Sequence, residues 1–103
     1  MTSTYAWTIT RDHLAEDDGS LASETGTTGP RDAPAGMLAQ LAAGQGARFR
    51  MYDDDGELYY DGRLIGDPES EDGFGPLDDF GTPNAGATEI RYYRPERGEW
   101  ETL

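Results

Sequence analysis

The segment 48–62 constrains the fold more than any other part of the chain, because it has the pattern of two strands joined by a tight turn. Residues 48–52 and 57–62 alternate large apolar with polar side chains, and an Asp-Gly pair at 55–56 marks the turn. A turn with an even number of residues keeps the apolar side chains of both strands on one face, whereas an odd number splits them. We therefore predict an antiparallel hairpin with an even turn. The expected inner face carries Phe49, Met51, Leu58 and Tyr60, and the outer face carries Arg48, Arg50, Tyr59 and Asp61.

Three further strands and one helix complete the predicted secondary structure. Residues 5–10 alternate apolar and polar side chains, 88–94 form a further strand, and a turn lets 99–103 return as a last strand. A helix of about ten residues is predicted to begin at Asp32, as its N-cap, and to end near Gly44. The apolar side chains expected to cover the sheet are Met37, Leu38 and Leu41.

Two long segments lack a regular pattern and are predicted as loops. Residues 16–31 are rich in Asp, Gly, Ser and Thr, and residues 66–88 are acidic and rich in Gly and Pro. The second loop carries Phe74, Leu77 and Phe80, which we expect to fold back onto the body of the protein. The 103 residues are thus predicted to form a single small domain, 1–103, of the α+β class. Its expected parts are an antiparallel sheet of four to five strands, one short helix packed on one face and a long irregular loop.

The charge balance excludes several classes of function. The chain has 8 Lys plus Arg against 21 Asp plus Glu, a formal net charge of −13, so direct nucleic-acid binding is not expected. It has no cysteine, which excludes disulfides, Cys-ligated zinc and a thiol nucleophile. No apolar run approaches the ~20 residues that span a bilayer, and the polar N-terminus lacks the apolar core of a signal peptide. We therefore expect a cytoplasmic protein with no membrane partner.

Candidate catalytic and metal-binding residues are few. His13 is the only histidine, and the serines lie in polar loops, so no catalytic triad is predicted. Carboxylates crowd residues 53–57, but an EF-hand loop with Gly56 as its sixth position would have Met51 first and Gly62 last, which are not Ca²⁺ ligands. We predict no enzyme activity, no cofactor and no metal-binding residue, with a divalent-cation site on the acidic turn as an alternative.

The aromatic residues indicate a surface for a partner. Neighbouring tyrosines on a strand point to opposite faces and one helix covers only one face, which leaves Tyr59 and Tyr93 partly exposed beside Arg50 and Arg91. Exposed tyrosine and arginine are enriched at protein interfaces. Cross-strand packing that stabilises the sheet is the alternative role. The predicted partner-binding residues are Arg50, Tyr59, Asp78, Asp79, Phe80, Asn84, Arg91 and Tyr93.

The composition and two segments of the chain indicate a source. All eight basic residues are arginine and Ala, Gly and Asp are abundant, which is typical of a genome rich in G and C or of its phages and plasmids. Residues 49–60 and 76–86 resemble small acidic uncharacterised proteins of actinobacteria. The resemblance agrees with such a source, and it implies no activity and no site residue.

Three functions stay open on the sequence. The first is a non-enzymatic protein-interaction or regulatory module, with self-association included. The second is an acidic mimic of nucleic acid that binds a DNA- or RNA-binding protein, and the third is a divalent-cation-binding domain that uses residues 53–57. The carboxylates that would stand in for phosphates in the mimic are Asp53, Asp54, Asp55, Glu69, Glu71 and Asp72.

Overall fold

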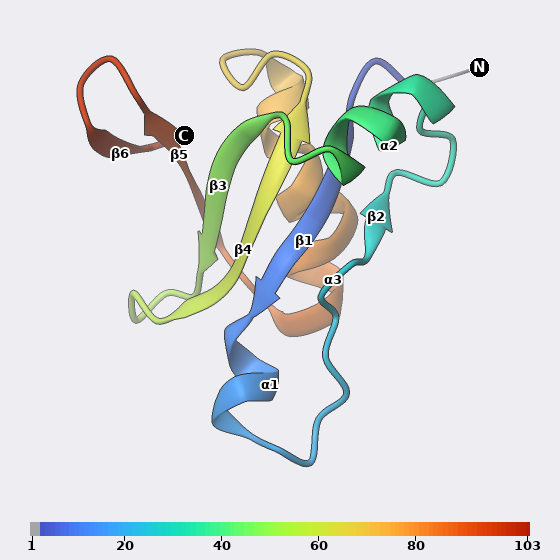
Figure 1. Cartoon of the computed structure of the whole chain (residues 1–103). Helices are drawn as coiled ribbons and strands as arrows, with labels where there is room; N and C mark the ends of the chain where they lie inside the picture. Colours follow the sequence, from blue (N-terminus) through green and yellow to red (C-terminus); the bar gives the residue numbers. More distant parts are fainter. Residues whose placement is uncertain (1–2) are drawn as a thin grey trace.

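A single open antiparallel sheet organises the protein, whose computed structural model describes residues 3–103. The α+β class is confirmed, but the sheet has six strands rather than four to five, in the order β2-β1-β4-β3-β5-β6 (Figure 1). The strands are β1 (Ala6–Asp12), β2 (Thr28–Gly29), β3 (Ala47–Tyr52), β4 (Leu58–Ile65), β5 (Glu89–Arg94) and β6 (Glu99–Thr102).

The additional strand, β2, lies inside the predicted loop 16–31 and pairs with β1 at one edge of the sheet. Gly29 lies opposite Trp7, and a β-carbon on this glycine would sit 2.4 Å from the indole Cζ2 atom. The absence of a side chain therefore lets the backbone approach the ring. A strand of two residues has no periodicity, so the sequence pattern could not predict it.

Strands β3 and β4 form the predicted hairpin. Of the two registers compatible with the pattern, the structure has Met51 opposite Tyr60. Phe49, Met51 and Tyr60 are buried on the inner face, as the alternation predicts. Leu58 was expected on the same face, but it is only half-buried and lies opposite Tyr52.

The turn of this hairpin has an odd number of residues, so the prediction of an even turn is wrong. The Asp53 N–H donates to the Glu57 carbonyl oxygen (3.1 Å) and the Gly56 N–H donates to the Asp53 carbonyl oxygen (3.1 Å), which closes a loop of residues 54–56. Gly56 has φ +80°, the left-handed conformation that ends such loops. An odd loop alone would place the apolar side chains of β3 and β4 on opposite faces. A bulge at Tyr59 adds one residue to β4, so Met51 and Tyr60 still lie on the same face.

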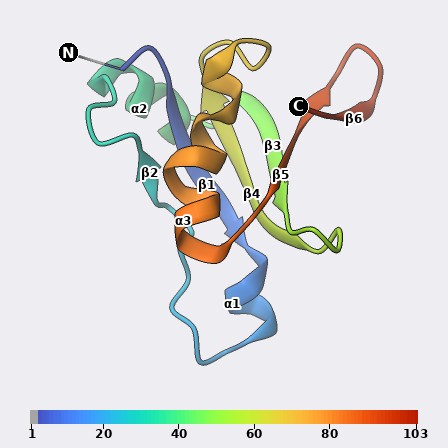
Figure 2. The same cartoon turned by 180° about the vertical axis from the view of Figure 1, so that it is seen from behind.

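Residues 71–85 form a helical segment where an irregular loop was predicted over 66–88, so that prediction is corrected. The segment consists of a 3₁₀ turn, η1 (Glu71–Phe74), a π-helical turn, η2 (Leu77–Gly81), and a short helix, α3 (Thr82–Ala85). Figure 2 shows it in orange in front of the sheet, where Leu77 and Phe80 are buried against the inner face. Phe74, Leu77 and Phe80 lie three residues apart, a helical interval, but the glycines and prolines among them indicate a loop.

Two more short helices, α1 (His13–Asp17) and α2 (Ala35–Ala42), follow β1 and β2 in the chain. The Asp12 carboxylate caps α1 by accepting a hydrogen bond from the Ala15 N–H (3.0 Å). α2 begins after Pro34, without the predicted side-chain cap from Asp32. Among residues 3–103, no helix combines the length and the apolar character needed to cross a membrane.

The helix α2 packs on one face of the sheet, as predicted, but not on the face that carries the main core. Figures 1 and 2 place α2 on the face opposite the 71–85 segment, beside β1 and β4. Leu41 is its only buried residue, whereas Met37 and Leu38 are half-buried. Of the three side chains expected to cover the sheet, only Leu41 is buried, and residues 71–85 cover the face that carries the main core.

The core lies between the inner face and the 71–85 segment, and its largest members are aromatic. The Phe80 ring lies 5.3 Å from the Trp7 ring and 5.1 Å from the Tyr60 ring, measured between centroids. The buried Tyr92 hydroxyl donates a hydrogen bond to the Gly73 carbonyl oxygen (2.8 Å), which ties β5 to η1. These contacts fix the helical segment on the inner face.

The burial of Tyr92 is expected to make the fold sensitive to alkaline pH. Burial raises the pKa of the Tyr92 hydroxyl above the ordinary tyrosine value of about 10. The unfolded chain can ionise this group above pH ~10 and the folded chain cannot, so its stabilising effect is complete below that pH and is lost as the pH rises further. Urea unfolding should therefore show a stability loss on the order of 1 kcal/mol from this group between pH ~10 and ~11. Tyr92→Phe should lose less, and an equal alkaline loss in both chains would contradict the assignment.

Candidate interaction face

The side chains of β3 to β6 that point away from the core form one surface, called the outer face below. Phe49 and Met51 are buried on the inner side of β3, so the residues between and beside them point to the opposite side. The outer face combines aromatic and arginine side chains with few carboxylates. Its residues are Arg48, Arg50, Tyr52, Asp61, Arg63, Glu89, Arg91, Tyr93 and Trp100.

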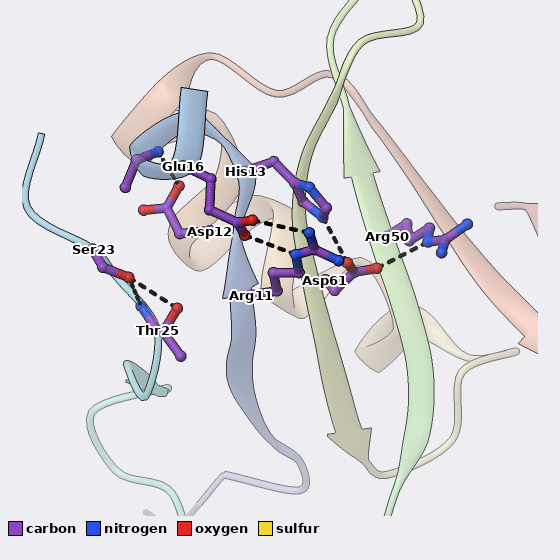
Figure 3. A network of polar contacts seen from close by, with 9 residues as sticks. Arg11, Asp12, His13, Glu16, Ser23, Thr25, Arg50 and Asp61 are labelled. Carbon is purple, nitrogen blue, oxygen red and sulfur yellow. Dashed lines mark hydrogen bonds and ion pairs between the residues drawn. The ribbon is translucent and has the colours of Figure 1, made fainter. Parts of the chain in front are cut away.

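Arg50 is held in place from two sides. Its Nε donates to Asp61 Oδ1 (2.9 Å), and the other carboxylate oxygen of Asp61 lies 2.6 Å from His13 Nε2, so Asp61 bridges the two bases (Figure 3). On the other side, the Arg50 guanidinium carbon lies 4.3 Å above the Trp100 ring centroid. A guanidinium that is both ion-paired and stacked has little rotational freedom, so it presents a fixed surface.

The aromatic side chains of the outer face also pack on one another. Tyr93 lies opposite Trp100 across β5 and β6, with ring centroids 5.4 Å apart. The Arg48 guanidinium lies 5.2 Å from the Tyr93 centroid and 5.3 Å from that of Trp100. Near the acidic turn, the Arg91 guanidinium lies 4.2 Å from the Tyr52 centroid. These arginine and aromatic side chains are all partly accessible to solvent, and contacts between neighbouring strands hold them in position.

Positive charge is concentrated on this face although the whole chain carries a formal charge of −13. The strand register sets Arg50 directly opposite Arg91, and Arg48 directly opposite Arg63. Four of the eight arginines therefore lie on one side of the sheet. Asp61 and Glu89 compensate only part of this charge, through ion pairs with Arg50 and Arg91.

The predicted partner-binding residues do not form one surface. The structure brings Arg50, Arg91 and Tyr93 together on the outer face. Tyr59 is displaced by the bulge: its ring packs edge-on against Tyr60, and its hydroxyl donates to the Asp53 carboxylate (3.1 Å). The remaining predicted residues, Asp78, Asp79, Phe80 and Asn84, lie on the 71–85 segment, on the other side of the sheet.

Two residues of that second group hold the helical segment to the sheet. Phe80 is 7 % exposed and packs in the core. The Asp79 carboxylate accepts hydrogen bonds from the Tyr5 hydroxyl (2.8 Å) and from Trp7 Nε1 (3.1 Å). The expectation that Phe80 faces a partner is corrected, because its ring is buried against the sheet. Asp79 is exposed, like Asp78 and Asn84, so its contacts with Tyr5 and Trp7 do not decide whether it faces a partner.

Sequence reasoning did not select Arg63, Tyr52 and Arg48 as partner-binding residues, although they share the outer face with Arg50. The alternation along β3 and β4 contains the signal, because residues two positions apart on a strand point to the same side. Trp100 could not be placed in advance, since only the register of β6 against β5 shows which side it occupies.

The acidic turn has a structural role in the hairpin. Asp53 Oδ1 accepts hydrogen bonds from the Asp55 N–H (2.9 Å) and the Glu57 N–H (2.8 Å). The bond from Glu57 is the main cause that lowers the pKa of the Asp53 carboxyl. Within residues 3–103 no group of three His, Cys, Asp or Glu side chains is arranged to hold a metal ion. The Asp53 carboxylate is thus engaged in closing the turn of the hairpin.

The outer face combines a hydrogen-bonded polar group with flat aromatic surface. Its one histidine neighbour, His13, lies 2.6 Å from Asp61, and Asp61 also accepts from Arg50, so these groups satisfy one another. The stacked arginine and aromatic side chains offer flat, polar-edged surface of the kind that anchors a protein interface. Comparisons of the chain with protein-family models, with curated proteins and with solved structures give no match.

Proposed function

We propose that this chain is a non-enzymatic interaction module that binds a partner protein through its outer face. The observation that supports the proposal is the cluster of Tyr93, Trp100, Arg48 and Arg50, which are stacked on one another and partly accessible. Tryptophan, tyrosine and arginine are the residues that most often contribute large shares of binding energy at protein interfaces. A stacked cluster also loses little side-chain entropy when it is covered.

The partner is proposed to be a protein rather than a nucleic acid. The formal net charge of −13 disfavours contact with the many phosphates of a nucleic-acid backbone, even though the outer face itself is basic. The mimicry of nucleic acid has less support, because its acidic residues lie in two groups. Residues 53–55 precede β4 and residues 69–72 follow it, so the groups lie at opposite ends of that strand (Figure 1). Neither group continues along the sheet as phosphates continue along a duplex.

Replacing Tyr93 with alanine is expected to weaken partner binding at least about tenfold while the fold is retained. The substitution removes the ring that stacks on Trp100 and on Arg48, whereas the core on the inner face is untouched. The measurement is capture of partners from a lysate of the source cells by immobilised wild type and variant, with bound proteins quantified by mass spectrometry. Circular dichroism shows whether the variant is folded.

Tyr59→Ala is the matched control for this experiment. Tyr59 is also a half-buried tyrosine, but the bulge directs it to the side of Tyr60 and away from the outer face. A partner held by wild type and by Tyr59→Ala, and lost by Tyr93→Ala, supports the proposal. A partner that all three chains retain equally shows that the outer face does not bind it.

A further inference from the structure

Arg48 and Arg63 form an unusual pair on the outer face. They lie directly opposite each other on β3 and β4, where like charges destabilise a sheet. Within residues 3–103, neither has a carboxylate oxygen within 4.0 Å, although the chain contains 21 acidic residues. The Arg63 side chain donates only to the Gly46 carbonyl oxygen (3.0 Å). The pair therefore keeps most of its hydrogen-bond donors free.

The neighbouring arginines differ in this respect. Arg50 and Arg91 lie opposite each other in the same way, but each has its own carboxylate, Asp61 and Glu89 respectively. The fold thus neutralises one facing pair of arginines and leaves the next pair without an acidic group. Two guanidinium groups held side by side attract a carboxylate more strongly than one does, and the bound carboxylate offsets the repulsion between them. The Arg48–Arg63 pair is therefore suited to an acidic group that another molecule supplies.

Two depressions of the surface meet at this pair. One, of about 350 Å³, extends toward β1 and is lined by Thr10, Arg11, Arg50 and Asp61 besides Arg48 and Arg63. The other, of about 310 Å³, extends toward the end of β5 and is lined by Gly46, Ala47, Tyr93, Arg94, Pro95 and Glu96 besides the same two arginines. The two depressions share Arg48 and Arg63, and the surface that they make up is called the groove below. Both of its parts are lined by these two guanidinium groups, which have no carboxylate partner.

We infer that Arg48 and Arg63 bind a carboxylate of the partner, and that an acidic segment of the partner protein lies along this groove. The inference rests on the proposed function and names the chemistry of its partner. Guanidinium groups donate two parallel hydrogen bonds to a carboxylate, and Tyr93 and Trp100 beside Arg48 offer apolar surface to the residues that flank it. Screening in physiological salt limits charge interactions to ~8 Å, so a short acidic segment in the groove interacts mainly with the arginines there. A long polyanion would extend beyond the groove and be repelled by the acidic residues of the rest of the chain.

The test uses a hexaglutamate peptide as the probe, titrated into the isotope-labelled protein and followed by NMR. We expect the Nε–H signals of Arg48 and Arg63 and the indole N–H signal of Trp100 to shift. Hexaglutamine, which has the same length and no charge, should shift none of them. Arg48→Gln and Arg63→Gln should each weaken hexaglutamate binding at least about tenfold, and thermal unfolding shows whether each variant is folded.

Arg97→Gln is the matched control, since Arg97 is an exposed arginine that lies in the turn after β5 and pairs with Glu101. It should bind hexaglutamate as wild type does. Equal affinity in Arg48→Gln and wild type overturns the inference, as does tighter binding of a hexathymidine oligonucleotide than of hexaglutamate.

The two proposals fail separately in these experiments. If hexaglutamate does not bind but Tyr93→Ala still loses a captured partner, the outer face binds a partner of other chemistry and only the acidic segment is refuted. If wild type and Tyr93→Ala capture the same proteins in equal amounts, the proposed function fails together with the inference that rests on it.

Discussion

Replacing Phe80 with alanine is expected to lower the free energy of unfolding by about 3–5 kcal/mol. The Phe80 ring is buried between the Trp7 and Tyr60 rings, and its loss leaves a cavity where the helical segment meets the sheet. A domain of this size is stabilised by about 5–15 kcal/mol in total, so the variant should be close to unfolding at 37 °C. Urea unfolding followed by tryptophan fluorescence measures the change directly, since Trp7 lies against the substituted ring.

Phe74→Ala is the control for this prediction, because Phe74 belongs to the same helical segment but is 40 % exposed. Its loss should be clearly smaller, about 1 kcal/mol. The comparison also decides between two roles for Phe80, which the sequence placed at a partner surface. If the Phe80→Ala variant is as stable as wild type and binds its partner more weakly, Phe80 lies at the surface and its burial in the core is contradicted.

Replacing Gly62 with alanine is expected to be the most disruptive single-methyl change in the sheet, with a loss of roughly 3 kcal/mol or more. A β-carbon at Gly62 would lie 2.2 Å from Phe49 Cζ and 2.4 Å from the Thr8 carbonyl oxygen. The first atom belongs to a buried ring and the second to the backbone of β1, so neither can move without loss of packing or of strand pairing. Thermal unfolding should show a melting temperature lower by roughly 15 °C or more.

Gly36→Ala is the matched substitution at a site without this constraint. Gly36 lies in α2, and nothing lies within 4 Å of a β-carbon built on it. Alanine favours the helix over glycine, so the melting temperature should rise, corresponding to about 0.5–1 kcal/mol. A Gly62→Ala chain that melts with wild type would show that Phe49 does not fill the space above this glycine.

The hairpin shows how far the sequence pattern reaches. Alternation placed Phe49, Met51 and Tyr60 on one face correctly, because successive side chains on a strand must point to opposite sides. The alternation assigned the wrong face to Leu58 and Tyr59, because a bulge at Tyr59 shifts the register next to a turn with an odd number of residues. A bulge is a feature of the paired strands and has no signature in the spacing of apolar residues. The pattern predicted the pairing of the strands but not the face on which every side chain lies.

The segment 66–88 shows the opposite case. Its glycines and prolines predict a loop, although the apolar Leu77 and Phe80 lie three residues apart, an interval that a helix also has. The segment is helical because burial of these side chains against the sheet outweighs weak local preferences. The displacement of α2 from the main core follows from the same fact, since only one segment can occupy the inner face.

The sequence by itself determined the α+β class, the positions of five strands and the alternation that separates the inner face from the outer face. These features depend on local backbone geometry, which neighbouring residues dictate. Only the tertiary structure decided that Phe80 belongs to the core, that Trp100 stacks on Arg50 and that Arg48 faces Arg63. The physical reason is that these contacts join residues far apart in the chain, and their formation depends on strand register and on competition for buried surface.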